Sequence, residues 1–264
     1  MILEPPAEPN RTTAPATSDK ANPASQLIVA LDLPSAEIAL DMADQLQGLC
    51  RWFKVGMELY YAAGNPVISR LRERGFDVFL DLKLHDIPNT VAGAVRSVSA
   101  AGASLLTLHA GGGRRMMQAA VEAADRPDAP RLLAVSVLTS MDEAELRGVG
   151  VVDASSEDGG MVQAQVLRLA RLAQSAGVHG LVCSPQEVAA VRAAMGPAAT
   201  LVIPGIRPAG TEGRDDQSRV ATPGSAIRDG ASMLVVGRPI TQAADPAKAA
   251  ELILNEIRAA NLPA

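Results

Sequence analysis

The chain has 264 residues, of which 48% are hydrophobic, 20% charged and 2% aromatic. This length suits two average domains or one α/β barrel, with a core built mainly from Ala, Val, Leu and Ile. The formal net charge is -5 and no basic cluster is present, which argues against a nucleic-acid-binding surface or one that binds an anionic membrane.

The two cysteines, Cys50 and Cys183, have neither metal-binding nor redox spacing, and so few thiols in a long chain favour a reducing compartment. We therefore expect a cytoplasmic protein, with Cys183 as a core residue because it lies in an apolar run. No stretch approaches the ~20 apolar residues of a membrane span, so no membrane association is expected.

Residues 1–25 contain five prolines and no apolar core. Glu4 and Glu8 interrupt the one place where the apolar region of a signal peptide could lie. We expect a disordered Pro/Ala-rich tail over residues 1–25, followed by a single domain over residues 26–264.

From Gln26 onward, short apolar runs alternate with polar residues and Ala/Leu-rich helical segments. Eight runs are typical of strands: Leu27–Leu31, Trp52–Val55, Val78–Leu84, Ser104–Leu108, Leu132–Leu138, Leu181–Cys183, Leu201–Ile203 and Met233–Val236. Helix starts are indicated at Ser35, Asn65-Pro66, Asn89-Thr90, Arg114, Ser184-Pro185, Thr222-Pro223 and Asp245-Pro246. Eight alternating units predict a parallel (β/α)8 TIM barrel. A doubly wound open sheet is the rival fold, but no Gly-x-Gly-x-x-Gly follows the first strand.

The fifth unit is irregular. A short helix is expected near Asp142 to Arg147, then a loop rich in Gly, Ser and Asp, and then a longer helix from about Met161 to Ala176.

The third strand carries the clearest chemistry. Its residues alternate, which places Val78, Leu80, Leu82 and Leu84 on one face and Phe79, Asp81, Lys83 and His85 on the other. At ~3.3 Å per residue, Asp81 and Lys83 lie close enough for their charges to meet, and Asp86 follows just past the strand. A structural ion pair is one interpretation. Buried pairs rarely stabilise a fold better than apolar residues do, however, so the pattern favours a reactive site.

Polar residues also follow the other strands, at the end where the active site of such a barrel lies. They are Asp32, Lys54, His109 and the pair Thr139 and Ser140. Each alone has a structural explanation, as a turn former, a helix cap or a core histidine. Their shared position favours an active site.

The seventh and eighth strands end in Pro204-Gly205-Ile206-Arg207 and Gly237-Arg238-Pro239-Ile240-Thr241. Loops after these strands often bind phosphate, because Gly lets backbone N–H groups approach oxygen and Arg supplies a planar charged fork. A glycine turn with a surface arginine is the simpler interpretation of either loop alone. Gly210 to Arg219 is long enough to act as a lid over the phosphate.

Taken together, these motifs resemble the orotidine 5'-phosphate decarboxylase family of bacterial type, over Leu27 to Thr241. Asp81 to Thr90 matches the family's Asp-x-Lys-x-x-Asp signature with its usual flanks. The other landmarks match in the same order, in Ala30-Leu31-Asp32, Phe53-Lys54-Val55-Gly56, Leu138-Thr139-Ser140, Pro204-Gly205-Ile206-Arg207, Asp216-Gln217 and Val236-Gly237-Arg238.

The resemblance implies decarboxylation of orotidine 5'-phosphate to UMP without cofactor or metal, with Lys83 protonating C6 of the pyrimidine. It implies a charge array of Lys54, Asp81, Lys83 and Asp86, the last supplied by the second subunit of a homodimer. The implied substrate contacts are Asp32, Lys54, Asp81, Ile87, Thr90, Thr139, Arg207, Gln217, Gly237 and Arg238. Whether Thr139 or Ser140 contacts the ring stays open.

The chemistry agrees with these roles. Loss of CO2 from C6 leaves a carbanion in the ring plane with no π-system to accept its electrons, so a fixed cation is needed there. Lys83 can stabilise that charge and then protonate it. Asp81 also places a carboxylate near the substrate's own, a strain that remote phosphate binding could offset.

Two alternative functions are considered, one of them enzymatic and the other non-catalytic. One is a Mg²⁺-dependent sugar-phosphate decarboxylase or synthase of the same superfamily, which is expected to carry an additional carboxylate where this chain has Lys54. The other is a phosphate-binding barrel without catalysis, which leaves the Asp/Lys array unexplained.

Overall fold

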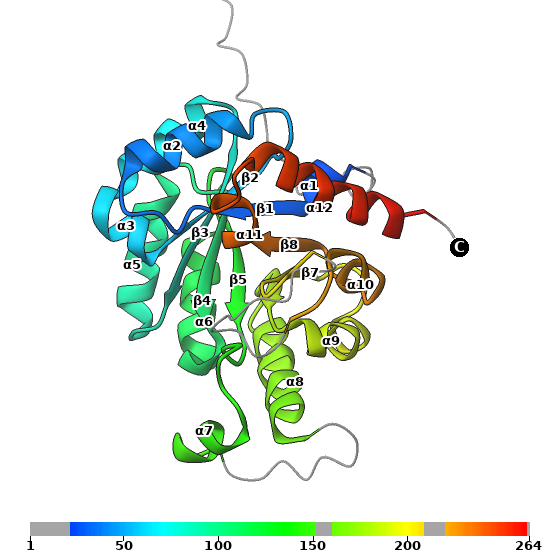
Figure 1. Ribbon diagram of the computed structural model, residues 1–264. Helices are drawn as coiled ribbons and strands as arrows, with labels where there is room; N and C mark the ends of the chain where they lie inside the picture. The colour runs from blue at the N-terminus through cyan, green and yellow to red at the C-terminus, as the bar shows by residue number, and fades with distance from the viewer. Residues whose placement is uncertain (1–21, 152–159, 209–219, 263–264) are drawn as a thin grey trace, which may run out of the picture.

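The computed structural model describes residues 22–151, 160–208 and 220–262 (Figure 1). Its eight parallel strands close into a barrel in chain order, with β1 paired to both β2 and β8. They are β1 Leu27–Ala30, β2 Trp52–Gly56, β3 Asp77–Leu84, β4 Leu105–His109, β5 Arg131–Val135, β6 Gly180–Val182, β7 Thr200–Ile203 and β8 Met233–Val236. The predicted (β/α)8 barrel is confirmed, because an open sheet would leave β1 and β8 apart.

The helices surround the barrel. They are α1 Pro23–Gln26, α2 Ala36–Gln45, α3 Met57–Ala63, α4 Asn65–Glu73, α5 Pro88–Ser99, α6 Gly113–Ala123, α7 Glu143–Gly148, α8 Gly160–Ser175, α9 Val188–Met195, α10 Pro223–Arg228, α11 Arg238–Thr241 and α12 Pro246–Ala260. Ser35, Thr222 and Asp245 accept backbone N–H groups as N-caps, as predicted. In the described parts of the chain, no helix has the length and hydrophobicity to cross a membrane.

The chain enters the barrel earlier than the sequence suggested. Residues 23–25, expected in the tail, belong to helix α1, where Ser25 and Gln26 are buried. The amide of Asn261, at the end of α12, donates to Oε1 of Gln26 at 2.6 Å. Local composition cannot predict this hydrogen bond, because it joins residues at opposite ends of the domain sequence. Residues 1–21 lie outside the described residues.

The core has two layers, which confirms that both faces of the third strand are buried at its start. Phe79 belongs to the cluster inside the barrel, whereas Val78 and Leu80 pack between the sheet and the helices. The interior cluster is completed by Ile28, Ala30, Trp52, Leu105, Leu133, Val202, Met233 and Val235. The inside of the barrel is therefore filled by side chains.

The end of β3 departs from the strict alternation that the sequence predicts. Its register with β4 shifts between Leu80 and Leu84, which marks a bulge. Within the bulge Lys83 has φ of +52°, the left-handed region that side chains other than Gly rarely adopt. The bulge re-aims the residues that follow Asp81, at the end of the barrel where polar residues gather.

Candidate active site

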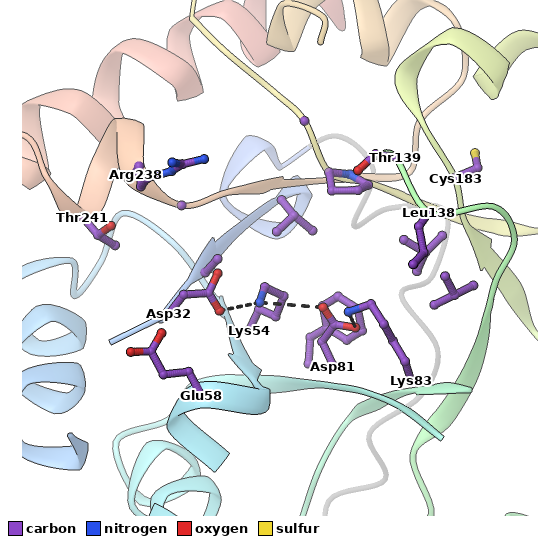
Figure 2. Close-up of a pocket in the computed structure, with 18 of the residues that line it drawn as sticks. Asp32, Lys54, Glu58, Asp81, Lys83, Leu138, Thr139, Cys183, Arg238 and Thr241 are labelled. Carbon is purple, nitrogen blue, oxygen red and sulfur yellow. Dashed lines mark hydrogen bonds and ion pairs between the residues drawn. The ribbon is translucent and has the colours of Figure 1, made fainter. Parts of the chain in front are cut away.

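A cavity of about 500 Å³ lies at the C-terminal ends of the strands. Every strand except β4, or the loop that follows it, contributes to the lining, and Figure 2 shows the labelled side chains around the cavity. Eight residues proposed from the sequence are among them: Asp32, Lys54, Asp81, Lys83, Thr139, Arg207, Gly237 and Arg238. Ser140, the alternative to Thr139, is not part of the lining.

Four of these side chains form a row of alternating charge. Nζ of Lys54 lies 2.7 Å from Oδ1 of Asp32 and 3.7 Å from Oδ2 of Asp81. Nζ of Lys83 lies 2.9 Å from Oδ1 of Asp81. Lys54 is only 8% exposed, and Figure 2 shows it between the two carboxylates. The row holds two ammonium groups at defined places along the cavity wall.

Asp81 is the centre of this row. Burial by itself raises the pKa of its carboxyl group, but the charges of Lys54 and Lys83 and hydrogen bonds from Lys83 and Thr107 outweigh burial, so the pKa lies below its usual range. Asp81 is therefore ionised at neutral pH. Two cations and a buried hydroxyl converge on one carboxylate, which holds it in a single orientation.

Thr107 was missed by the sequence analysis, which placed it in an apolar run. Its Oγ1 lies 3.0 Å from Oδ1 of Asp81 and accepts the backbone N–H of Lys83 at 2.9 Å. The alternation of β4 could have identified it. Leu105, two residues earlier, faces the barrel interior, and residues two apart on a strand face the same side, so Thr107 is expected to face inward as well. A hydroxyl on that face had to find a polar partner.

Gly56 makes room for the Asp32–Lys54 pair. A Cβ added at this position would lie 2.6 Å from Oδ1 of Asp32 and 2.8 Å from Nζ of Lys54. Such distances are shorter than real contacts of a methyl group, so any larger residue at this position would force the ends of the Asp32 and Lys54 side chains to shift.

The loops after β7 and β8 supply the other end of the cavity. Gly205 has φ of +76°, which favours glycine, and turns the chain so that Arg207 lines the cavity. Gly237 and Arg238 join β8 to α11, and Figure 2 shows Arg238 across the cavity from Lys83. Two arginines and two glycines from these loops thus line the cavity, as expected for a phosphate site.

Several predicted residues do not join the cavity of this chain. Asp86, Ile87 and Thr90 are exposed around the start of α5, where Oδ1 of Asp86 accepts the N–H of Ile87 at 2.6 Å. Gln217 and the proposed lid, Gly210 to Arg219, lie outside the described residues.

His109, expected at the active edge of the barrel, does not line the cavity. Its ring stacks on His85, with centroids 5.1 Å apart and planes at 11°. Nδ1 of His109 accepts the N–H of Gly111 at 3.1 Å. Burial, together with the charges of His85 and Lys83, lowers the pKa of His109.

The lining also contains residues that the sequence analysis did not single out. They include Leu33, Glu58, Val137 and Gln242, most of them one or two positions beyond a motif or in the helix that follows. Cys183 is buried, as predicted, and also contributes to the cavity wall.

Comparison with known proteins agrees with this geometry. A family model described as "Orotidine 5'-phosphate decarboxylase / HUMPS family" matches residues 25–253. The orotidine 5'-phosphate decarboxylase of Anaeromyxobacter sp. (strain K) is 51% identical over 231 residues, which are 88% of this chain and 97% of that protein. That of Pseudomonas aeruginosa (strain LESB58) is 50% identical over 236 residues, again 88% and 97%.

A solved structure gives the same result. The crystal structure of orotidine 5'-phosphate decarboxylase from Lactobacillus acidophilus superimposes with a TM-score of 0.75 at 38% identity, covering 88% of this chain and 99% of that one. The chain therefore belongs to the orotidine 5'-phosphate decarboxylase / HUMPS family.

Proposed function

We propose that this enzyme decarboxylates orotidine 5'-phosphate to UMP and CO2, the last step of de novo pyrimidine synthesis. The observation that carries the proposal is the row Asp32, Lys54, Asp81 and Lys83 inside the cavity. A binding protein has no need of this row, because buried charges are costly and phosphate is held elsewhere in the cavity.

Lys83 is the proposed acid. When the bond between C6 and the carboxylate breaks, its electron pair stays on C6 and CO2 leaves. The ammonium of Lys83 stabilises the carbanion and then transfers a proton to C6, after which the neutral amine regains a proton from water. Asp81, ionised and 2.9 Å from Lys83, keeps the ammonium in place between turnovers.

Lys54 and Asp32 are proposed to hold the ribose hydroxyl groups. Lys54 is shared between two carboxylates, so its position is set before substrate arrives. Such preorganisation lowers the cost of ordering the site at the moment of reaction. Thr139 is proposed to contact the pyrimidine ring.

Arg207, Gly237 and Arg238, with Gln217, are proposed to bind the phosphate. Arg238 lies across the cavity from Lys83 (Figure 2), which suits a substrate with its phosphate at one end and its carboxylate at the other. Binding energy from the phosphate can then be used at C6, although no phosphate contact touches a reacting atom.

The proposed assembly is a homodimer in which Asp86, Ile87 and Thr90 complete the partner's site. The exposure of these residues supports the assembly: Ile87 is a large apolar side chain just beyond the strand that carries Lys83, and it is 66% exposed. A cytoplasmic location is likewise proposed, in keeping with Cys50 and Cys183, which are both buried and form no disulfide with each other.

The test is to add orotidine 5'-phosphate to the purified protein in the presence of EDTA and to follow the loss of the substrate's ultraviolet absorbance. We expect full turnover. A strict requirement for added Mg²⁺ would favour the metal-dependent decarboxylase or synthase, and tight binding without turnover would favour the non-catalytic barrel.

A further inference from the structure

Thr107 is a buried hydroxyl beside the charged row, and it does not line the cavity. The residue is 0% exposed, on β4, facing the bulge at the end of β3. Its Oγ1 is within hydrogen-bond distance of two groups that belong to different residues of β3, the backbone N–H of Lys83 and the carboxylate of Asp81.

The direction of both hydrogen bonds follows from chemistry. A backbone N–H can only donate, so the hydroxyl oxygen must accept from Lys83. The hydroxyl proton is then free, and the ionised Asp81 carboxylate can only accept it. Thr107 therefore uses its donor on Asp81 and one acceptor site on Lys83, and neither bond can reverse.

The bulge explains why Lys83 needs this partner. The regular ladder between β3 and β4 is interrupted from Leu80 to Leu84, and within this interruption the N–H of Lys83 donates to the side chain of Thr107. A buried N–H without an acceptor is strongly disfavoured. The side chain of Thr107 supplies the acceptor, which stabilises the left-handed conformation of Lys83 at φ of +52°.

The same hydroxyl orients Asp81. Oδ1 accepts from both Thr107 and Nζ of Lys83, while Oδ2 lies toward Lys54. A carboxylate held by Lys83 and Lys54 alone could rotate about its Cβ–Cγ bond and exchange its oxygens. The hydrogen bond from Thr107 distinguishes the two oxygens and fixes the plane of the group.

We propose that Thr107 is a positioning residue for the reaction, which sets the backbone of Lys83 and the carboxylate of Asp81 through one hydroxyl group. The proposal rests on the function proposed above, in which Lys83 and Asp81 do the chemistry. Thr107 touches no substrate atom, so it acts on the chemical step and leaves substrate binding largely unchanged.

The test compares Thr107→Val, which keeps the shape and removes the hydroxyl, with Thr107→Ser, which keeps the hydroxyl. We expect kcat of the Val variant to fall on the order of 10- to 100-fold, the range seen when a group that orients a functional ligand is removed. KM for orotidine 5'-phosphate and Kd for UMP should stay within about threefold, because the phosphate and ribose contacts remain. The Ser variant should recover most of kcat.

A second measurement reports on geometry without turnover. Amide hydrogen exchange of the peptide that contains Lys83 should be faster in the Val variant than in the parent and the Ser variant. If Thr107→Val does not fold, Thr107→Ala takes its place with the same expected split between kcat and KM.

The outcomes separate this inference from the proposed function. A parent protein that does not turn over orotidine 5'-phosphate overturns the function itself. An active parent with a Val variant of equal kcat overturns the role of Thr107. A Ser variant as slow as the Val variant, with KM raised in both, also overturns it, because that pattern indicates a packing effect.

Discussion

Nζ of Lys83 lies 2.9 Å from Oδ1 of Asp81, although the backbone of Lys83 is in the left-handed region and not in the extended conformation of a strand. In a regular strand the two would point the same way and Lys83 would remain in the ladder. Here a bulge re-aims the chain just past Asp81 and still preserves the ion pair. The geometry of the charged row therefore depends on how the neighbouring strands hold β3, so the residues that support the row can be tested by substitution.

Replacing Gly56 by Ala should disrupt the Asp32–Lys54 pair. The new Cβ would lie 2.6 Å from Oδ1 of Asp32 and 2.8 Å from Nζ of Lys54, so both side chains must shift from their present positions. Displacing a positioned group by about 1 Å can cost on the order of 100-fold in rate, and we expect a loss of that size in kcat/KM.

Gly148→Ala is the matched control. A Cβ at Gly148, in helix α7, would have no neighbour within 4 Å, so this variant should keep the parent kcat/KM. Parent-level kcat/KM in Gly56→Ala would show that the Asp32–Lys54 contact is not needed for the reaction.

Replacing Arg238 by Ala should lower kcat/KM by roughly two to four orders of magnitude. An arginine contact to a dianion in a closed site contributes on the order of 3 to 5 kcal/mol. The measurement uses two substrates, because on orotidine, which lacks the phosphate, parent and variant should react equally.

Arg258→Ala, on the exposed side of α12, removes the same charge away from the cavity and should have no effect. An equal loss on both substrates would mean that Arg238 does not bind the phosphate.

Stability should fall on mild acidification, in part through His109. Its folded-state pKa is lowered by burial and by the positive charges of His85 and Lys83, and its Nδ1 is occupied by the N–H of Gly111. Below the unfolded pKa of about 6.5, the unfolded chain therefore binds a proton that the folded chain resists. This contribution to stability is complete above that pKa and is lost as the pH falls toward the folded value.

His109→Asn keeps an acceptor for Gly111 and cannot be protonated in this range. Denaturant midpoints measured from about pH 7.5 to about pH 5.5 should therefore fall less steeply in the variant than in the parent. The same pH dependence in both proteins would assign the loss to other groups.

The shared site predicts that two inactive variants rescue each other. Lys83→Ala and Asp86→Asn each inactivate both sites of their own homodimer, whereas a mixed dimer has one site with both defects and one with neither. Random exchange of equal amounts makes half the dimers mixed, so activity should recover to about a quarter of the parent value.

The experiment refolds the two variants together, with each refolded alone as the control. If mixed dimers form and no activity returns, Asp86 acts within its own chain and the shared-site proposal fails.

Much of the architecture was predictable from local pattern. All eight strands fall within one to three residues of the predicted runs, because aliphatic runs of strand length separated by helical segments specify a parallel barrel. The residues Asp32, Lys54, Asp81 and Lys83 could be proposed as a site for a related reason. Ionisable groups among apolar strand residues are costly, and the strand ends of such a barrel share one rim.

What the sequence could not decide depends on contacts between distant segments. The bulge at Lys83 and the hydroxyl of Thr107 arise from the register between β3 and β4, which is set only when the barrel closes. The choice of Thr139 over Ser140 for the cavity depends on side-chain directions beyond the end of β5, where no two-residue period applies. The stacking of His109, the last residue of β4, on His85 depends on where the chain just past β3 places His85. Local pattern therefore determined the strands and the charged residues, whereas barrel closure decided which of their atoms meet.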